Sequence, residues 1–351
     1  MKEYDFLFVQ NAPAFYKINL FNALSTNYRI GVIFLGESEQ VVMNKVSMRW
    51  EFDAYYLNKN NLDRSNAIEV LIDSWKMSKM IRSVKYRYII YGGWTNAEFA
   101  IMMFLTSRKS NCIISESSIY ESKTTGAKGL LKRLILNRNS YAFVSGLPHK
   151  DLLSHLKYRG VVHITGGVGL ALRNHKPVPS EGCHERHPLR YVYTGRIIEL
   201  KNLELLIKAF NENGKQLTII GTGCKETEYK AMAKSNVTFL GFIDNSKLKE
   251  IYVNCDCLIL PSCSEVWGFV VEEALYNGLP VIVSNMVGCN IDMVRNYDTG
   301  VIFNHQSIDS LQKAIEQMEQ NYQRYKNNAM AIDWEKRDKK QIEAFTSILQ
   351  A

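Results

Sequence analysis

Residues 260–285 read LPSCSEVWGFVVEEALYNGLPVIVSN, and this stretch decides the fold of the second half of the chain. An apolar run ends at Pro261, a loop of small residues carries Glu265, and a helical run ending at Gly278 leads into a second apolar run. A strand, a helix and a strand in this order predict a βαβ unit of a parallel sheet.

The helix of this stretch begins near Gly268, where unpaired backbone N–H groups and the positive end of the helix dipole favour a phosphate. Glu265 and Glu273 lie eight positions apart, one in the loop and one in the helix. Carboxylates beside a phosphate need another partner, and sugar or ribose hydroxyls are suitable ones. An ordinary strand–turn–helix with Glu265 as a helix cap is the other interpretation of this stretch alone.

The composition is that of a soluble globular protein, with 351 residues, 46% of them apolar and 22% charged. No N-terminal signal pattern and no apolar run of membrane-spanning length is present, so we expect a cytoplasmic protein. Seven cysteines without a CxxC pair favour reduced thiols. Cys183, His184 and His187 form a metal-like cluster that we interpret as coincidence, and we expect neither a metal nor a cofactor.

The formal net charge of +8 is unevenly distributed. Residues 122–150 contain no acid and include Lys123, Lys128, Lys132, Arg133, Arg138 and Lys150. Leu130, Leu131, Leu134 and Ile135 lie at helical spacing beside these cations. Residues 123–138 therefore fit either a peripheral contact with an anionic membrane or the solvated face of a core-packed helix. Aromatic and basic residues are not interleaved there, which argues against a nucleic-acid partner.

Apolar strands alternate with helices along the whole chain, which predicts an α/β protein with two Rossmann-like, doubly wound domains. A polar, Pro-containing connection within residues 170–188 separates the halves, so we assign residues 1–168 and 169–333 to the two domains. A charged amphipathic helix near residues 334–351 is expected to pack back on the first domain. Asn11, Trp94 and Glu116 follow strands of the first domain and are expected at a central cleft that the two domains face.

Strand ends of the second domain present cations, glycines, apolar side chains and carboxylates. Arg196 follows one strand, Gly221-x-Gly223 ends the next, and Ile243 ends a third. Residues 199–211 are predicted as one helix with Lys201 in its first turn. A nucleoside diphosphate-sugar needs such a set, with two cations doing the work of a metal at its diphosphate. Taken alone, the two cations also fit an ordinary surface loop.

Two segments carry a family resemblance, YTGRIIELKNLELLIKAF (193–210) and SEVWGFVVEEALYNGLPVI (264–282), with IIGTG and FLGFID in order between them. They resemble the retaining GT-B glycosyltransferases of family 4, the glycosyl transferases group 1, and their surface-polysaccharide assembly branch. The match is strong over residues 191–303 and weak before them. Many members have a glycine pair where this chain has Asn11-Ala12-Pro13, and a histidine where it has Ser115-Glu116.

The resemblance implies that Arg196 and Lys201 hold the diphosphate, Glu273 the ribose and Glu265 the donor sugar. Glu116 is the catalytic candidate of the first domain, where Asn11 and Trp94 lie on the acceptor side. The remaining donor-binding residues are Gly195, Gly221, Gly223, Ile243, Val266, Trp267, Gly268 and Phe269.

The expected function is therefore metal-independent, retaining transfer of a sugar from a nucleotide diphosphate-sugar to a hydroxyl of a lipid-linked or polysaccharide glycan. The reaction is expected in the cytoplasm, with a peripheral contact at the inner face of the cell membrane. A nucleotide-sugar epimerase of related fold, a non-catalytic nucleotide-sugar binding module and a membrane-associated scaffold are the alternatives.

Overall fold

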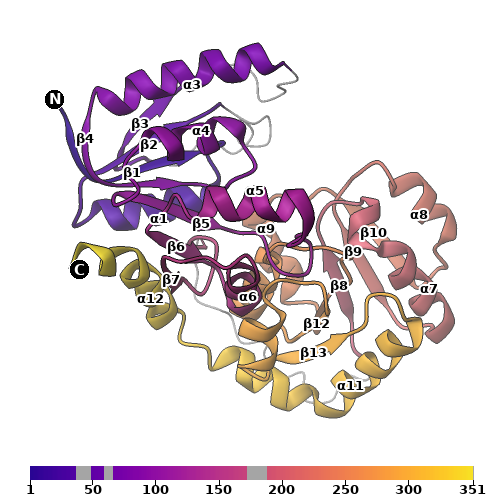
Figure 1. Ribbon diagram of the computed structural model, residues 1–351. Coiled ribbons are helices and arrows are strands. Elements are labelled where there is room, and N and C mark those ends of the chain that lie inside the picture. Colours follow the sequence, from indigo (N-terminus) through magenta and orange to yellow (C-terminus); the bar gives the residue numbers. More distant parts are fainter. Residues whose placement is uncertain (37–48, 59–65, 172–187, 351) are drawn as a thin grey trace. The chain divides into compact units, whose positions relative to one another are not determined.

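The computed structural model describes residues 1–36, 49–58, 66–171 and 188–350 (Figure 1). The chain divides into two compact units, unit 1 with Met1–Leu172 and Glu335–Ala351, and unit 2 with Arg173–Trp334. Cys183, His184 and His187, together with most of the expected connection, lie outside the described residues.

Unit 1 is built on a seven-stranded sheet in which all neighbouring strands are parallel. Its spatial order is β3-β2-β1-β4-β5-β6-β7. The strands are β1 (Glu3–Gln10), β2 (Ile30–Phe34), β3 (Asp53–Tyr56), β4 (Lys85–Tyr91), β5 (Asn111–Ser115), β6 (Tyr141–Val144) and β7 (Val161–Ile164).

Helices cover both faces of this sheet (Figure 1). One core cluster contains Leu7 and Val9 with side chains of α3 (Ala67–Arg82), α4 (Ala97–Leu105), α5 (Gly126–Leu136) and α6 (Leu147–His155). The other contains Phe6 and Phe8 with side chains of α1 (Phe15–Ser25), α12 (Trp334–Thr346) and the 3-10 turn η3 (Ser347–Leu349). Alternate residues of β1 thus enter opposite cores, as the period of a strand requires.

Unit 2 has a six-stranded parallel sheet of order β10-β9-β8-β11-β12-β13. Its strands are β8 (Tyr191–Thr194), β9 (Leu217–Ile220), β10 (Val237–Gly241), β11 (Cys257–Leu260), β12 (Val281–Ser284) and β13 (Gly300–Phe303). Its helical segments are η1 (Glu199–Lys201), α7 (Leu203–Asn213), α8 (Glu226–Met232), α9 (Asn245–Tyr252), α10 (Phe269–Tyr276), η2 (Asn290–Arg295) and α11 (Ile308–Met330).

The strand order of each sheet reverses once, between β1 and β4 in unit 1 and between β8 and β11 in unit 2. In open parallel sheets, ligands bind beyond the carboxyl ends of the strands at such a reversal. The loops after β1, β4, β8 and β11 are therefore the parts of the fold on which to look for a site.

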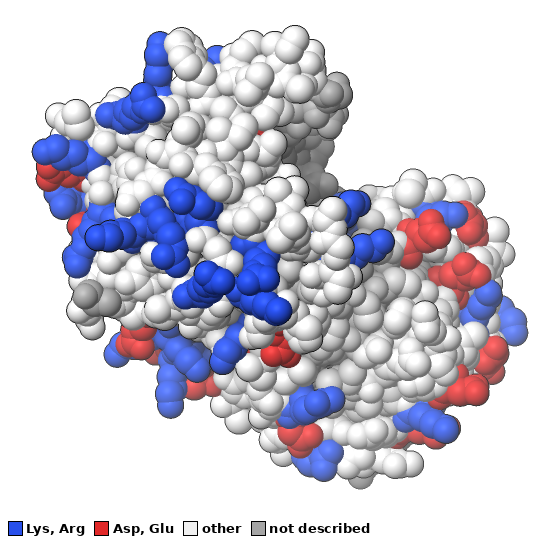
Figure 2. Space-filling view, viewed as in Figure 1, with Lys and Arg blue, Asp and Glu red and all other residues white. Residues whose placement is uncertain are grey.

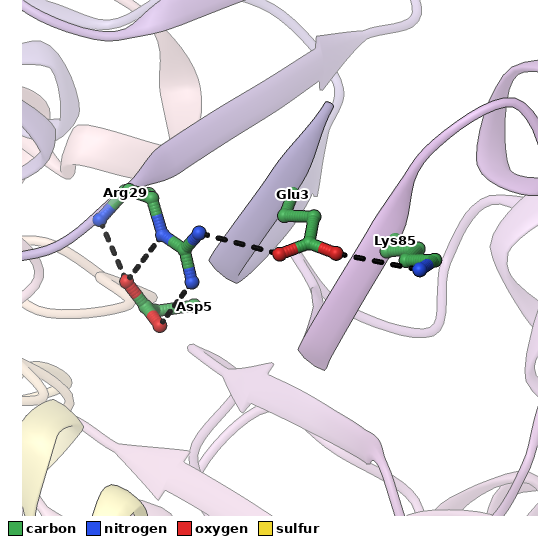
Figure 3. A network of polar contacts seen from close by, with 4 residues as sticks. All are labelled: Glu3, Asp5, Arg29 and Lys85. Carbon is green, nitrogen blue, oxygen red and sulfur yellow. Dashed lines mark hydrogen bonds and ion pairs between the residues drawn. The ribbon is translucent and has the colours of Figure 1, made fainter. Parts of the chain in front are cut away.

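The opposite edge of the unit 1 sheet carries a network of exposed charges (Figure 3). The Arg29 guanidinium contacts Asp5 at 3.4 Å and Glu3 at 3.5 Å, and Lys85 contacts Glu3 at 3.4 Å. Exposed pairs of this kind contribute about 0–1 kcal/mol each. They stabilise the amino ends of the strands modestly and take no part in the site at the carboxyl ends.

Two features of the secondary structure differ from the sequence-based expectation. The helix predicted over residues 199–211 is interrupted, because Asn202 adopts a left-handed conformation (φ 56°, ψ 36°) between η1 and α7. β3 was not predicted, because its four half-buried residues follow a mixed aromatic stretch without clear alternation. Within the described part of the chain, no helix is both long and apolar enough to cross a membrane.

Candidate active site

The core of the candidate site in unit 2 is an ion pair between the Lys201 ammonium and the Glu265 carboxylate. Lys201 ends η1 after β8, and Glu265 lies in the loop after the adjacent strand β11. Only 12% of the Lys201 side chain and 19% of the Glu265 side chain are exposed. The two loops are also joined by a hydrogen bond of 2.9 Å from the Cys263 amide to the Leu200 carbonyl. Each charge is thus held against its partner with little water around it.

Asn202 fixes the position of Lys201. Its side-chain amide donates to the carbonyl oxygens of Pro261 at 3.2 Å and His305 at 2.8 Å. These carbonyls lie in the loops after β11 and β13, so one amide joins three loops at the carboxyl edge of the sheet. Asparagine is one of the few residues besides glycine that enter the left-handed region readily.

Glu265 is fixed from its other side by the segment after β12. The Glu265 amide donates to the Met286 carbonyl at 3.2 Å, and the Gly288 amide donates to the Glu265 carbonyl at 2.9 Å. These bonds form an isolated parallel bridge between Glu265 and Val287. The Glu265 carboxylate is therefore positioned by backbone on both sides rather than by a mobile loop.

Arg196 lies in the same loop after β8 as Lys201. Its side chain is exposed, and its carbonyl accepts a hydrogen bond of 2.8 Å from the Tyr193 hydroxyl. Burial raises the pKa of Tyr193, the nearby Glu265 carboxylate raises it further, and Arg196 opposes them. Arg196 and Glu265 are therefore both within electrostatic range of the same hydroxyl.

The glycines of the site allow two backbone loops to touch. A Cβ on Gly221 (φ +133°) would lie 1.9 Å from the Gly195 carbonyl oxygen, and a Cβ on Gly223 would lie 2.2 Å from the Ile197 carbonyl oxygen. The Ile197 amide donates to the Thr222 carbonyl at 2.8 Å across the same contact. Side chains at these two glycines would push the loop after β9 away from the loop after β8, which carries Arg196 and Lys201.

α10 begins beside the ion pair, after Gly268, which has φ +95°. Trp267 is buried, and its indole Nε1 donates to the Glu272 carboxylate at 2.6 Å. Glu272 is itself buried and thus holds the start of α10 in place. Val266 and Phe269, on either side of this anchor, are half-buried, as is Ile243 in the loop after β10.

Glu273 lies one residue further along α10 and is only partly exposed. Loss of hydration, and to a smaller extent the charge of Glu272, raises the pKa of Glu273 to about 7. Burial raises the pKa of Tyr252, and the nearby Glu273 raises it further. Around neutral pH the Glu273 carboxyl is therefore about half protonated.

In unit 1, Glu116 forms an ion pair with Lys17 of α1. The Lys17 side chain is 7% exposed and that of Glu116 34% exposed. Asn11, after β1, is exposed, and its carbonyl accepts a hydrogen bond of 3.1 Å from the Gly36 amide. Trp94 is partly buried and packs against the core. Because β1, β4 and β5 are neighbours in the sheet, these residues share one edge of it.

Sequence reasoning missed Lys17, Asn202 and the anchoring role of Glu272. Lys17 carried a usable signal, because it lies on the apolar face of a predicted helix, where a buried cation requires a counter-charge. Asn202 follows Lys201 in a segment whose sequence predicts a continuous helix. No neighbouring residue indicates that the backbone of Asn202 is left-handed. Within the described residues, no group of three or more His, Cys, Asp or Glu side chains could hold a metal ion.

Residues 184–341 match the family of glycosyl transferases group 1. The match covers 158 of the 351 residues, so the likeness to this family concerns the second half of the chain. The group 1 match covers the site loops of unit 2, from Gly195 to Glu273, and ends within α12.

Similar proteins extend the comparison. The chain is 28% identical over 136 residues to the uncharacterized glycosyltransferase MJ1607 of Methanocaldococcus jannaschii, covering 36% of this chain and 35% of that protein. It is 29% identical over 136 residues to the capsular polysaccharide biosynthesis glycosyltransferase CapM of Staphylococcus aureus, covering 36% and 35%. The chain thus spans about a third of the length of each of these curated relatives.

A solved structure, that of Anabaena HepE in complex with UDP, superposes with a TM-score of 0.72 at 16% identity and covers all of both chains. This likeness concerns the fold. The predicted α/β class is confirmed, since two Rossmann-like units with parallel sheets form the GT-B fold.

Proposed function

We propose that the chain is a retaining, metal-independent glycosyltransferase that moves a sugar from a nucleotide diphosphate-sugar to an acceptor hydroxyl. The observation that carries this proposal is the Lys201–Glu265 ion pair at the strand-order reversal of the group 1 domain. The cation and the carboxylate lie side by side where two loops meet, and both are largely shielded from solvent. Such a pair suits a phosphate, which the cation would bind, next to a sugar hydroxyl, which the carboxylate would bind. The fold likeness to a protein solved with UDP supports the same donor class.

In the proposed complex, the Lys201 ammonium and the Arg196 guanidinium contact the diphosphate. Glu265 accepts hydrogen bonds from donor sugar hydroxyls, and Glu273 accepts them from the ribose. Ile243 lies by the base, and the backbone of residues 266–269 contacts sugar and phosphate. When the donor binds, the diphosphate takes the place of Glu265 beside Lys201, and a sugar hydroxyl takes the place of Lys201 beside Glu265. Neither charge is therefore left unpaired.

The proposed reaction breaks the bond between the anomeric carbon and the phosphate oxygen, and its electron pair passes to the diphosphate. The acceptor oxygen bonds to the anomeric carbon on the same face, and its proton passes to a leaving phosphate oxygen. Negative charge grows on the diphosphate during bond cleavage. A preorganised cation aimed at that charge stabilises it by about 3–4 kcal/mol.

Unit 1 supplies the acceptor side in this proposal. Glu116, which pairs with Lys17, is the candidate for contact with the acceptor hydroxyl, with Asn11 and Trp94 along the same sheet edge. We propose a glycan or lipid-linked acceptor at the inner face of the cell membrane. The similarity to CapM and the basic segment 123–138 support this choice.

The test is transfer from UDP-, GDP- and dTDP-sugars, with and without a chelator. Lys201→Met is expected to lower kcat about 100-fold or more. Lys208→Met is the matched control, because Lys208 is exposed on α7 and pairs with Glu204 at 2.6 Å. Equal turnover of the two variants would refute the assignment. An isomerised donor formed without acceptor would indicate an epimerase, and donor binding without turnover on any acceptor a binding module.

A further inference from the structure

α5 of unit 1 presents an apolar stripe to solvent. Leu130, Leu131 and Leu134 are 58%, 59% and 54% exposed, and they lie three and four residues apart on one side of the helix. Ile135 and Leu136 on its other side are buried in the core. α5 therefore has apolar residues on both sides, and only one side is needed for packing.

The stripe continues onto the end of α4. Phe104 and Leu105 are 52% and 60% exposed. The Arg138 guanidinium, just after α5, lies 5.2 Å from the Phe104 ring centre and donates to the Phe104 carbonyl at 3.3 Å. Arg138 thus connects the two exposed apolar groups. Together Phe104, Leu105, Leu130, Leu131 and Leu134 form what we call the α4–α5 apolar patch.

α3 presents a third apolar group on the same side of unit 1. α3, α4 and α5 all contribute to the core cluster on one sheet face, so their outer surfaces point away from that face together. Trp75 of α3 is 60% exposed, and the Lys79 ammonium lies 3.6 Å from the centre of its ring. Tryptophan beside a cation is a common arrangement at the level of lipid headgroups.

Basic side chains surround the patch. Lys123 and Lys128 are exposed at its amino end, and Arg108 and Lys109 are exposed just after α4. No acidic residue occurs between Glu121 and Asp151. In Figure 2, Lys and Arg side chains gather over the central part of unit 1, with uncharged surface between them. A binding partner for this surface must therefore be both apolar and anionic.

We propose that the α4–α5 apolar patch docks unit 1 on an anionic lipid bilayer, with α5 lying in the headgroup region. The leucines enter the acyl boundary, while the surrounding lysines and arginines contact anionic headgroups. Charge complementarity favours an anionic bilayer over a neutral apolar partner. This docking extends the proposed placement of the acceptor at a membrane, and it is tested separately because vesicle binding is measured without a donor.

The test is sedimentation of the whole chain with phosphatidylcholine vesicles, with and without phosphatidylglycerol. We expect binding only to the anionic vesicles, weakened by salt. Lys128→Glu/Arg133→Glu is expected to weaken binding at least about 20-fold, since each basic residue near an anionic surface contributes about fivefold. Leu130→Ser/Leu131→Ser/Leu134→Ser is expected to weaken it at least about 10-fold.

Two matched controls are available. Lys313→Glu/Lys340→Glu makes the same change in net charge at exposed sites on α11 and α12, and Leu240→Ser changes a leucine that is 46% exposed in unit 2. Both controls should bind like the parent chain. No binding by the parent chain, or an equal loss in the controls, would overturn the proposal. So would self-association in sedimentation velocity that the triple serine variant abolishes, because the patch would then join two copies of the chain.

Discussion

Glu273→Gln should make unit 2 more stable above neutral pH and leave it unchanged in acid. The folded protein holds the pKa of Glu273 at about 7, against an ordinary value of 4.5 for a glutamate. Between these values the folded protein keeps the proton while the unfolded chain releases it. The free energy of unfolding contributed by Glu273 is therefore full below pH 4.5 and is lost as the pH rises through about 7.

The size of this effect follows from the two pKa values. A difference of about 2.5 pH units corresponds to about 3 kcal/mol. Glutamine is neutral at every pH, so the variant avoids the cost of ionising a partly dehydrated carboxyl beside Glu272. We expect the two proteins to be equally stable near pH 4.5 and the variant to be about 3 kcal/mol more stable above pH 8.

The assay is hydrogen exchange of the backbone amides of β11 and β12 in urea, read by mass spectrometry at several pH values. These buried strands report on unit 2 separately from unit 1. A pH-independent difference between the proteins, or a less stable variant at pH 8, would refute the reasoning. If Glu273 also accepts hydrogen bonds from a ribose, donor affinity of the parent chain should rise through pH 7, and that of the variant should not.

Substitutions at three further positions test the architecture of the site. Gly221→Ala should destabilise unit 2 by at least about 3 kcal/mol in urea unfolding, because its Cβ would lie 1.9 Å from a carbonyl oxygen at φ +133°. Asn202→Gly should lower the free energy of unfolding by about 2 kcal/mol, because two hydrogen bonds are lost. Asn202→Ala should lower it by about 1 kcal/mol more, because alanine is strained in the left-handed conformation. Lys17→Met should lower kcat at least about tenfold and leave the KM for the donor unchanged, because it removes the counter-charge of Glu116.

Each of these substitutions has its own control. Gly214→Ala also places a side chain at positive φ (+69°) but meets no atom within 4 Å, so it should cost only about 1–2 kcal/mol. Equal losses at positions 214 and 221 would show that the close approach is unimportant. Equal stability of the two Asn202 variants would contradict the backbone argument. For Lys17, restoring the cation with Lys17→Arg should recover part of the kcat, and a raised donor KM instead would remove Glu116 from the acceptor side.

The fold was predictable because strands buried on both faces are continuous apolar runs, and glycine or proline marks their ends. The loops of Lys201 and Glu265 were predictable as neighbours for the same reason, since parallel strands bring their carboxyl ends to one edge. Their direct ion pair was not, because it depends on Asn202 ending η1 in a left-handed conformation. That conformation is fixed by carbonyl oxygens about 60 and 100 residues away, a tertiary effect that no local pattern contains.

The basic helix α5 is a second case in which the local sequence did not determine the tertiary contacts. The spacing of Leu130, Leu131, Leu134 and Ile135 predicted a helical apolar face, but spacing alone could not tell whether that face enters the core. Ile135 is buried in the core together with Leu136, while the three leucines are exposed. The roles of Arg196 and Glu116 remain predictions, since they depend on a donor and an acceptor rather than on the folded chain.

The last helix of the chain gives unit 1 an unusual order of assembly during translation. Phe345 of α12 stacks on Phe143 with ring centres 4.4 Å apart and lies in the core that also holds Phe8. These late residues leave the ribosome only after all of unit 2 has been made, roughly 20–70 s after the first strands at ordinary rates of synthesis. Until then the sheet surface around Phe8 and Phe143 lacks its final cover. We expect this nascent surface to be a binding site for a ribosome-associated chaperone.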